Sequence, residues 1–443
     1  MQPRDFIHDF QLHDLPAQVA AQLPLALMDL IGVAAGGAET RAAGNMAQLA
    51  CQQFGGTQPM LFANGTASSS GVALSAGMTI DALDFHDGFN PAKGHIGCPL
   101  FAAILPVAHR LDASGLDFLA ALAMGYEFGA RASVAQHATA PDYHTSGSWG
   151  AVTAAAACAR LMGLDATQTR HALGIAEYHG PRSQMMRCID HPTMLKDGSS
   201  WGAMAGVAAA ELAAMGFTGA PAITVEDAPD HWADLGHVWQ LNQQYYKNYP
   251  VCRWAQPPIE AALSLMRDHS LHHSAITGLH VTTFHAATRL ATAHPATTEE
   301  AQYSTTFPTA VAIVRGDVTP ADIADDALND ADVNRLSGLM TFSEDDHANA
   351  VFPHQRVAQV TLTLADGQTL TSDWHEPRWD ATDPPEASEL RAKFAALTRP
   401  RLGAAWSANI LEAINTLNGR PFADLAALIC QPINRDTSAG NSA

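Results

Sequence analysis

The tetrapeptide Ser-Trp-Gly-Ala occurs twice in the chain, at residues 148–151 and 200–203, and each copy opens a run of small residues. The first run reads AVTAAAACARLMGL and the second reads MAGVAAAELAAMGF. Each contains a Met-Gly pair, Met162-Gly163 or Met215-Gly216, at a position that suits the C-cap of a helix. The duplication therefore predicts two matched helices.

A cation or a cationisable side chain lies five residues before each tryptophan: His144 in the first copy and Lys196 in the second. The start of a helix offers unpaired N–H groups and the positive end of the helix dipole, which suit a carboxylate or a phosphate. We therefore predict a small anion held between the two helix starts, with contacts from the serines there. These are Ser146, Ser148, Ser199 and Ser200. The alternative is that both segments are close-packed core helices.

Composition narrows the class of protein. A chain of 443 residues, 47% of them hydrophobic, can bury a large core in two or more domains. Its formal charge of −20 argues against nucleic acid or an anionic membrane as a partner. The six cysteines form no CxxC pair, and the N-terminal residues lack the apolar core of a signal peptide. We therefore expect a soluble, cytoplasmic protein with free thiols.

The hydrophobic pattern changes along the chain. Apolar residues recur at helical spacing from about residue 15 to 265, whereas ITGLHVTTFHAAT, from residue 276, alternates as a strand does. Two further alternating runs flank Asp366-Gly367 and predict a hairpin, and residues 297–316 and 320–340 look helical. The pattern predicts a mainly α protein with a helical domain at 1–267 and a smaller α+β domain at 268–392. A closing helix pair at 393–430 packs back onto the first domain, and 431–443 form a disordered tail.

The densest polar cluster lies in the glycine-rich segment 84–97, between two apolar helices. Aspartate and histidine together provide an orienting group and a proton shuttle that works near neutral pH. Two alternatives stay open, a polar turn and a metal site. The four side chains that could ligate a metal, Asp84, His86, Asp87 and His95, match no common metal motif.

Two cations in the segment YKNYPVCRW, Lys247 and Arg253, could hold a carboxylate, and arginine can do so with two parallel bonds. Taken singly, each could equally be a solvated surface residue. Together with the polar loop and the two helix starts, they outline one anion site assembled from four separated segments.

Residues 198–202 indicate another possible chemistry, that of a serine hydrolase. Their sequence, Gly-Ser-Ser-Trp-Gly, fits the G-x-S-x-G nucleophile elbow of serine hydrolases. That motif needs a buried strand before the serine, and the preceding residues, HPTMLKD, do not read as one. No phosphate-binding or dinucleotide-binding glycine motif occurs, so nothing implies a nucleotide cofactor.

Several segments resemble the MmgE/PrpD family in the same order along nearly the whole chain. They are ALDFHDGFNPAKGHIG, YHTSGSWGAVTAAAACARLMGLD, TMLKDGSSWGAMAGVAAAELAAMGFTGA, KNYPVCRWAQPPIEAAL and AQYSTTFPTAVA. The family includes dehydratases, decarboxylases and epimerases of small carboxylates. The resemblance implies a large helical domain with an α+β lid, usually as a homodimer, and a site between the two domains. The catalytic positions that it implies are Asp84, His95, His144 and Lys196.

Three residues depart from the family pattern: Gly88 replaces a threonine, Gln256 a histidine, and Phe307 the active-site tyrosine. We expect Phe307 to contact the substrate in place of that tyrosine. These departures disfavour the methylcitrate and cis-aconitate activities in particular.

The function that we expect is that of a carbon–oxygen lyase of the dehydration type. It would act on a small di- or tricarboxylate, by proton transfer at a carbon next to a carboxylate, with no metal or organic cofactor. An epimerase of an iminodisuccinate-like dicarboxylate is the runner-up. A carboxylate-binding protein that has lost catalysis is the third alternative.

Overall fold

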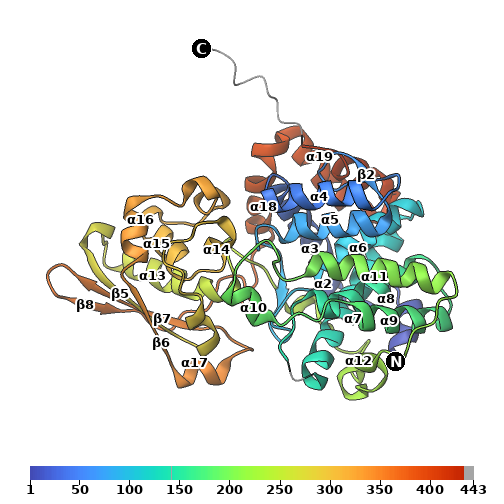
Figure 1. Cartoon of the computed structure of the whole chain (residues 1–443), viewed down its shortest axis with the longest axis horizontal. Coiled ribbons are helices and arrows are strands. Elements are labelled where there is room, and N and C mark those ends of the chain that lie inside the picture. Colours follow the sequence, from blue (N-terminus) through green and yellow to red (C-terminus); the bar gives the residue numbers. More distant parts are fainter. Residues whose placement is uncertain (141, 434–443) are drawn as a thin grey trace, which may run out of the picture.

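The protein has two lobes (Figure 1). The larger lobe is helical and contains both small-residue runs of the sequence, and the smaller lobe is built on a β-sheet. The computed structural model describes residues 1–140 and 142–433. The prediction of a mainly helical protein with a smaller α+β part is confirmed. Residues 434–443 of the predicted tail lie outside the described residues.

The larger lobe is a packed group of helices, most of which share one hydrophobic core. Two short antiparallel pairs join them, β1 (Gln58–Pro59) with β2 (Thr66–Ala67) and β3 (Gly88–Phe89) with β4 (Gln244–Tyr245). The helices of this lobe are α1 (Pro3–Asp9), α2 (Ala17–Ala20), α3 (Leu23–Gly37), α4 (Arg41–Gln53), α5 (Ser69–Asp81), α6 (Gly97–Arg110), α7 (Gly115–Thr139), α8 (Gly147–Leu161), α9 (Ala166–His179), α11 (Ser199–Ala214), α12 (Ile223–Glu226), α18 (Ala387–Leu402), α19 (Ala404–Asn415) and α20 (Phe422–Ile429).

The smaller lobe has a four-stranded sheet in the order β6-β5-β7-β8, in which only the β5–β6 pair is parallel. The strands are β5 (Ile276–Thr283), β6 (Met340–Glu344), β7 (Ala358–Leu364) and β8 (Thr369–Thr371). The helices are α13 (Gln256–Asp268), α14 (Thr298–Gln302), α15 (Thr306–Arg315), α16 (Ala331–Ser337) and α17 (Asp346–Val351), and α10 (Met185–Asp190) crosses from the larger lobe. Figure 1 shows α10 between the two lobes.

The second hydrophobic core contains the buried apolar residues of α10 and those between Tyr249 and Leu370. It therefore takes in α13, which lies before the boundary that we predict at residue 268. The amphipathic pattern of α13 resembles that of the preceding helices, so the pattern alone gives no sign that this helix packs against the sheet.

The C-terminal helices return to the larger lobe. Phe394 of α18 packs against Gly32 of α3, where a Cβ at the glycine would lie 2.9 Å from the ring. Lys393 Nζ lies 2.7 Å from the carboxylate of Asp29, and both side chains are buried. This ion pair connects α3, near the N-terminus, with α18, near the C-terminus.

One stretch, Ala17–Gly37, has the length and apolar composition of a membrane span. In the structure, 72% of the 18-residue window in it that meets this test is buried, as is common for a core helix. It is the only such stretch among the described residues, and it carries the ion-paired Asp29.

The two Ser-Trp-Gly-Ala helices, α8 and α11, pack directly on each other through glycine. A Cβ on Gly206 of α11 would lie 2.4 Å from Ala154 Cβ and 2.6 Å from the main-chain oxygen of Ala151. A Cβ on Gly202 would lie 2.4 Å from the oxygen of Gly147. The small residues are therefore needed for close approach of the two backbones.

This packing predicts opposite effects for two glycine substitutions. Gly206→Ala should lower the free energy of unfolding by about 1–3 kcal/mol because backbone atoms of α8 cannot move aside. Gly44→Ala, in the exposed face of α4 with nothing within 4 Å of the new methyl group, should raise it by about 0.5–1 kcal/mol. Urea unfolding measures both, and equal effects would contradict the packing argument.

Candidate active site

The polar loop between α5 and α6 folds against β4 and the segment that follows it. Gly88 and Phe89 of the loop pair antiparallel with Tyr245 and Gln244. Asp84 takes a φ of 47°, a left-handed conformation that non-glycine residues adopt only when their surroundings hold them there. The pairing brings the loop next to Lys247 and Arg253.

The two segments and the smaller lobe enclose a small cavity of about 20 Å³. Four described cations line it, namely Lys93, Lys247, Arg253 and Arg356. The other polar groups on its wall are Asp84, Asp197, His95 and the phenols of Tyr143, Tyr245 and Tyr303. Cations outnumber carboxylates here although the whole chain carries a charge of −20, so the cavity favours an anion.

Lys247 is tied to the loop by two hydrogen bonds. Its Nζ donates to Asp84 Oδ1 at 2.5 Å and to the main-chain oxygen of Asp84 at 2.7 Å. Burial by itself lowers the pKa of Lys247, but the Asp84 carboxylate opposes that effect and the pKa lies above its ordinary value. Lys247 is therefore a positive charge buried inside the protein.

His95 is a neutral imidazole with one free nitrogen. Its Nδ1 lies 2.5 Å from the main-chain oxygen of Asp87, which can only accept, so Nδ1 carries the proton and Nε2 does not. Burial, with the nearby His86 and Lys247, lowers the pKa of His95 to about 3. The Asp84 carboxylate, 3.8 Å from Nε2, can stabilise the imidazolium that forms when His95 accepts a proton.

Arg253 and Arg356 enter the cavity from different parts of the chain. Arg253 is held by Asp380 at 2.9 Å and by the main-chain oxygens of Tyr246 and Arg378. Arg356 donates to Asn90 of the loop and to the oxygen of Pro353. The Nε groups of both arginines are buried without a hydrogen-bond partner among the described residues.

The two helix starts meet, and Asp197 of the chain itself lies between them. The Ser146 hydroxyl donates to the Asp197 carboxylate, and the Gly147 N–H donates to the Asp197 main-chain oxygen at 3.1 Å. Burial raises the pKa of Asp197 well above its ordinary value, and the charge of Asp81 adds to the effect. A carboxyl group of the protein thus occupies the place predicted for a bound anion, and its raised pKa favours the neutral acid.

None of the four predicted serines lines the cavity. Ser146 connects Asp197 to the main-chain N–H of His95 at 2.8 Å, and Ser148 is bonded to Gln136. Ser199 and Ser200 are buried, and a Cβ on Gly77 of α5 would lie 2.6 Å from the Ser200 Cα. Their small size serves packing, as the alternative reading of the two segments states.

The remaining predicted residues do not line the cavity. Lys196 is buried, its Nζ donates to Gln302, and it lies 5.4 Å from the centre of the Tyr303 ring. Burial lowers its pKa. His144 is buried with an unpartnered Nδ1, but its neighbour Tyr143 is the residue on the cavity wall. Phe307 is fully buried in the second core.

Six charged or phenolic wall residues were not among the predicted site residues, although Lys93 belongs to the predicted polar loop. They are Lys93, Tyr143, Asp197, Tyr245, Tyr303 and Arg356. Four of them directly neighbour or lie within two positions of predicted residues, namely Lys93, Tyr143, Asp197 and Tyr245. Arg356 carries no local signal, because it lies just before β7 and reaches the loop only through the tertiary fold.

Two groups of side chains have the composition of a metal site, Asp81 with His86 and Cys98, and Asp84 with His86 and His95. At the first group, His86 Nε2 is 3.2 Å from Asp81, and its Nδ1 faces the oxygen of Asp87. The contacts in the structure oppose a cation at the second group. Asp84 already carries the Lys247 ammonium, which would repel a metal ion at the same oxygen.

The serine hydrolase alternative has no support from the contacts of Ser200. Its hydroxyl is buried without a hydrogen-bond partner in the described ranges, so it lacks the base that would activate a nucleophile. The residues before it form turns and α10, not a strand.

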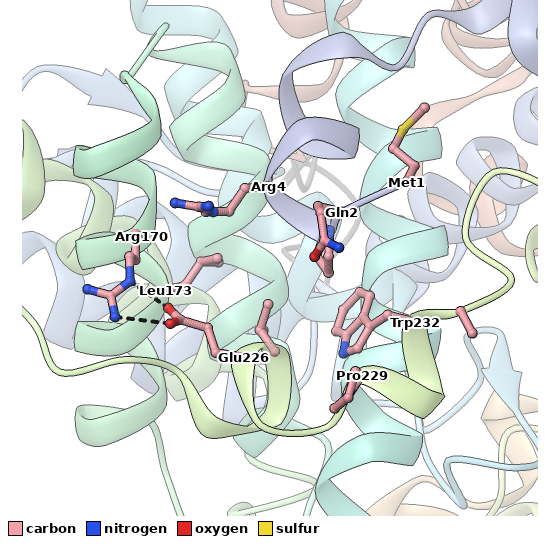
Figure 2. Close-up of a pocket in the computed structure, with 11 residues that line it drawn as sticks. Met1, Gln2, Arg4, Arg170, Leu173, Glu226, Pro229 and Trp232 are labelled. Atoms are coloured by element: carbon pink, nitrogen blue, oxygen red, sulfur yellow. Dashed lines mark hydrogen bonds and ion pairs between the residues drawn. The ribbon is translucent and has the colours of Figure 1, made fainter.

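A larger cleft of about 460 Å³ lies elsewhere, where α1 approaches α9 and α12. Figure 2 shows Arg170 of α9 paired with Glu226 of α12 on one side of it and Trp232 on the other. No predicted site residue lines this cleft, and of its two arginines, Arg4 and Arg170, the second is neutralised by Glu226. The small cavity is therefore the better candidate.

Comparison with known proteins finds one family along most of the chain. The sequence model of the MmgE/PrpD N-terminal domain matches residues 4–230, and that of the MmgE/PrpD C-terminal domain matches residues 249–418. Cis-aconitate decarboxylase of Mus musculus is 24% identical over 359 residues, which cover 73% of this chain and 70% of that protein. The Homo sapiens protein of the same name is 25% identical over 355 residues, 73% and 71% of the two chains.

A third relative, the cis-aconitate decarboxylase-like protein oryM of Aspergillus oryzae, is 34% identical over 114 residues. That match covers 24% of each chain.

His137 of α7 lies beside the cavity wall, with its ring 5.5 Å from Tyr143 and 5.0 Å from Trp149. Both of its ring nitrogens are buried without a partner among the described residues. Burial, followed by the charges of Lys93 and His144, lowers its pKa to about 4.

The depressed pKa of His137 predicts a pH-dependent stability. Between pH 6.5 and about 4 the unfolded chain binds a proton at this residue and the folded chain does not, so stability falls as the pH falls. The variant His137→Phe lacks this effect. From pH 7.5 to pH 5 its stability relative to the wild type should rise by about 1–2 kcal/mol. Urea unfolding at the two pH values measures this, and a difference that does not change with pH would contradict it.

Proposed function

The chain belongs to the MmgE/PrpD family, and from that premise we propose that it is a lyase for a small di- or tricarboxylate. The reaction proposed is a dehydration: removal of a proton next to a carboxylate and loss of a hydroxyl group as water. The family and its cis-aconitate decarboxylase relatives support a lyase of the dehydratase or decarboxylase type.

The observation that carries the proposal is the pair of unpartnered guanidinium Nε groups. Arg253 and Arg356 are each nearly fully buried, and both line the cavity. A buried N–H without a partner costs about 1–3 kcal/mol, and more in a charged group, so it stabilises a ligand that supplies an acceptor. A carboxylate does so with the strength of a charge-assisted hydrogen bond.

The same cavity can support the proton transfer. His95 Nε2 is the base, held in the right tautomer by the Asp87 main-chain oxygen. Loss of the α-hydrogen puts a second negative charge on that carboxylate, which nearby fixed cations stabilise. Lys247 and the two arginines supply these cations, and Asp84 stabilises the imidazolium.

Binding requires the lobes to separate. A cavity of about 20 Å³ holds roughly one water molecule, far less than a dicarboxylate. Its wall includes Arg356 and Tyr303 from the smaller lobe and Asp84 and His95 from the larger one. The structure thus corresponds to a closed state, and opening between the lobes admits the substrate.

Two related activities are the alternatives. A decarboxylase would form the same kind of carbanion by losing carbon dioxide, the activity named for the relatives. An epimerase would return the proton to the opposite face of the carbon. A protein that binds carboxylates without catalysis is the third case.

Proton NMR in deuterium oxide separates these cases. The panel is citrate, 2-methylcitrate, cis-aconitate, iminodisuccinate, tartrate and malate. We expect at least one hydroxylated member to lose its α-hydrogen signal and give a vinyl signal, because His95 removes the α-hydrogen and the hydroxyl group leaves. His95→Gln should lower this rate at least about 10²-fold.

The other outcomes of this assay are equally readable. Exchange with the carboxylate otherwise unconsumed would assign an epimerase, and consumption of cis-aconitate with loss of carbon dioxide would assign a decarboxylase. Saturable binding without exchange would assign the inactive binding protein and overturn the lyase.

Arg356 provides a second test. Arg356→Met removes one guanidinium from the cavity and should weaken binding of the non-reactive tricarballylate about 10- to 100-fold. Arg335→Met is the matched control, because Arg335 is in the same lobe but binds main-chain oxygens of Ile276 and His273, outside the cavity. Calorimetric titration measures both, and equal effects would contradict a carboxylate contact at Arg356.

A further inference from the structure

Tyr245 is a phenol of the cavity wall that has a free hydroxyl group. The Tyr143 hydroxyl, by contrast, donates to the main-chain oxygen of Lys93, and the Tyr303 ring lies 5.4 Å from Lys196 Nζ. No described residue is hydrogen-bonded to the Tyr245 hydroxyl, although Tyr245 is 2% exposed. Tyr245 lines the cavity together with His95, and their ring centres are 6.4 Å apart.

The position of the Tyr245 ring depends on the glycine opposite it. A Cβ on Gly88 would lie 2.3 Å from Tyr245 Oη and 2.4 Å from the adjoining ring carbon, much closer than real atoms approach. Gly88 is in a short strand and does not need a positive φ. Residue 88 is therefore a glycine because the Tyr245 ring occupies the space that a side chain would need.

The surroundings of Tyr245 favour the loss of its proton more than those of the other two phenols. The guanidinium of Arg253 lies 4.3 Å from the centre of the ring, and that of Arg356 lies 5.9 Å away. Burial raises the pKa of Tyr245, but Lys247, Arg356 and Arg253 oppose this effect. At Tyr303, burial and the carboxylate of Asp84 act together and raise the pKa much further.

We propose that Tyr245 is the catalytic acid of this site, which gives its proton to the departing hydroxyl group of a hydroxylated di- or tricarboxylate, and that Gly88 is the positioning residue that makes room for it. The proposal rests on the proposed function and narrows the substrate to a carboxylate with a hydroxyl leaving group.

The step is balanced as follows. His95 Nε2 takes the hydrogen next to the carboxylate, and the electron pair of that C–H bond first moves onto the carboxylate, where the fixed cations stabilise it, and then forms the new C=C bond. The C–O bond breaks, its electron pair stays on oxygen, and the oxygen takes the Tyr245 proton and leaves as water. The phenolate lies between two guanidinium groups until solvent returns its proton, and the His95 imidazolium releases one proton to solvent.

The first experiment compares Tyr245→Phe with the wild type on the panel carboxylate that the wild type dehydrates. We expect the rate of vinyl product formation to fall about 10²- to 10³-fold, while exchange of the α-hydrogen in deuterium oxide falls less than about 10-fold, because His95 remains. Binding of tricarballylate, which has no hydroxyl group, should change less than about 3-fold. The control is Tyr249→Phe. The Tyr249 hydroxyl donates a hydrogen bond of 2.9 Å to Glu260, and this pair lies outside the cavity.

Gly88→Ala supplies an independent variant. The new methyl group should displace the Tyr245 ring and lower product formation as Tyr245→Phe does. Added to Tyr245→Phe, it should lower the rate less than about 3-fold further, because the hydroxyl group on which it acts is already absent. Circular dichroism and tricarballylate binding establish that each variant is folded.

The outcomes separate this proposal from the proposed function. A wild type that exchanges no panel carboxylate would overturn both. An active wild type with an equally active Tyr245→Phe, or with exchange and elimination reduced equally, would overturn the role of Tyr245 alone. Exchange without elimination in the wild type would also overturn it and leave a carbon-acid site in place.

Discussion

The contact between Lys247 and Asp84 is the constraint on which the site depends. Removing two charged groups from water costs several kcal/mol for each, which a hydrogen-bonded pair of opposite charges can offset. The second bond of Lys247, to the main-chain oxygen of Asp84, helps to hold that residue at its left-handed φ of 47°. The rest of the loop, including the oxygen that fixes the His95 tautomer, follows from this anchored backbone.

The tightly packed larger lobe is the physical reason why such a cluster can persist. Helices α8 and α11 approach each other closely at Gly147, Gly202 and Gly206, so the backbone around Asp197 is held in place. A rigid surface of this kind keeps fixed charges in place when water is excluded, as stabilisation of a developing carbanion requires. The smaller lobe adds Arg356 and Tyr303 to a wall that is otherwise made by the larger lobe and by residues 244–254.

The sequence predicts local structure well where the signal is local. The hairpin at Asp366-Gly367 is confirmed, with Leu362 opposite Leu370 and Gly367 at a φ of 86°. Strand β6 was missed: we expected residues 320–340 to be helical throughout. There the structure has short helical turns and α16, followed by a strand from Met340 that pairs with β5. A parallel pairing between segments about 60 residues apart leaves no local pattern.

The candidate site shows the same difference between features with a local sequence signal and features set by tertiary contacts. The polar loop and the Lys247 segment carry dense clusters of chemistry-bearing residues, so the sequence identifies them. The partners that complete them are set by tertiary contacts: Asp197 fills the anion position between the helix starts, and Tyr245 occupies the space that Gly88 leaves. Phe307 illustrates the converse, because a position implied by the family resemblance lies here in a hydrophobic core.

The most direct test of the account is hydrogen exchange, read by mass spectrometry, with and without tricarballylate. A carboxylate held between the lobes should slow amide exchange in residues 84–97 and 244–254, whose segments form the cavity wall. It should leave the cleft of Arg170 and Glu226 unchanged. Protection at that cleft, or saturable binding with no protection in either cavity segment, would contradict a substrate site at Lys247 and His95.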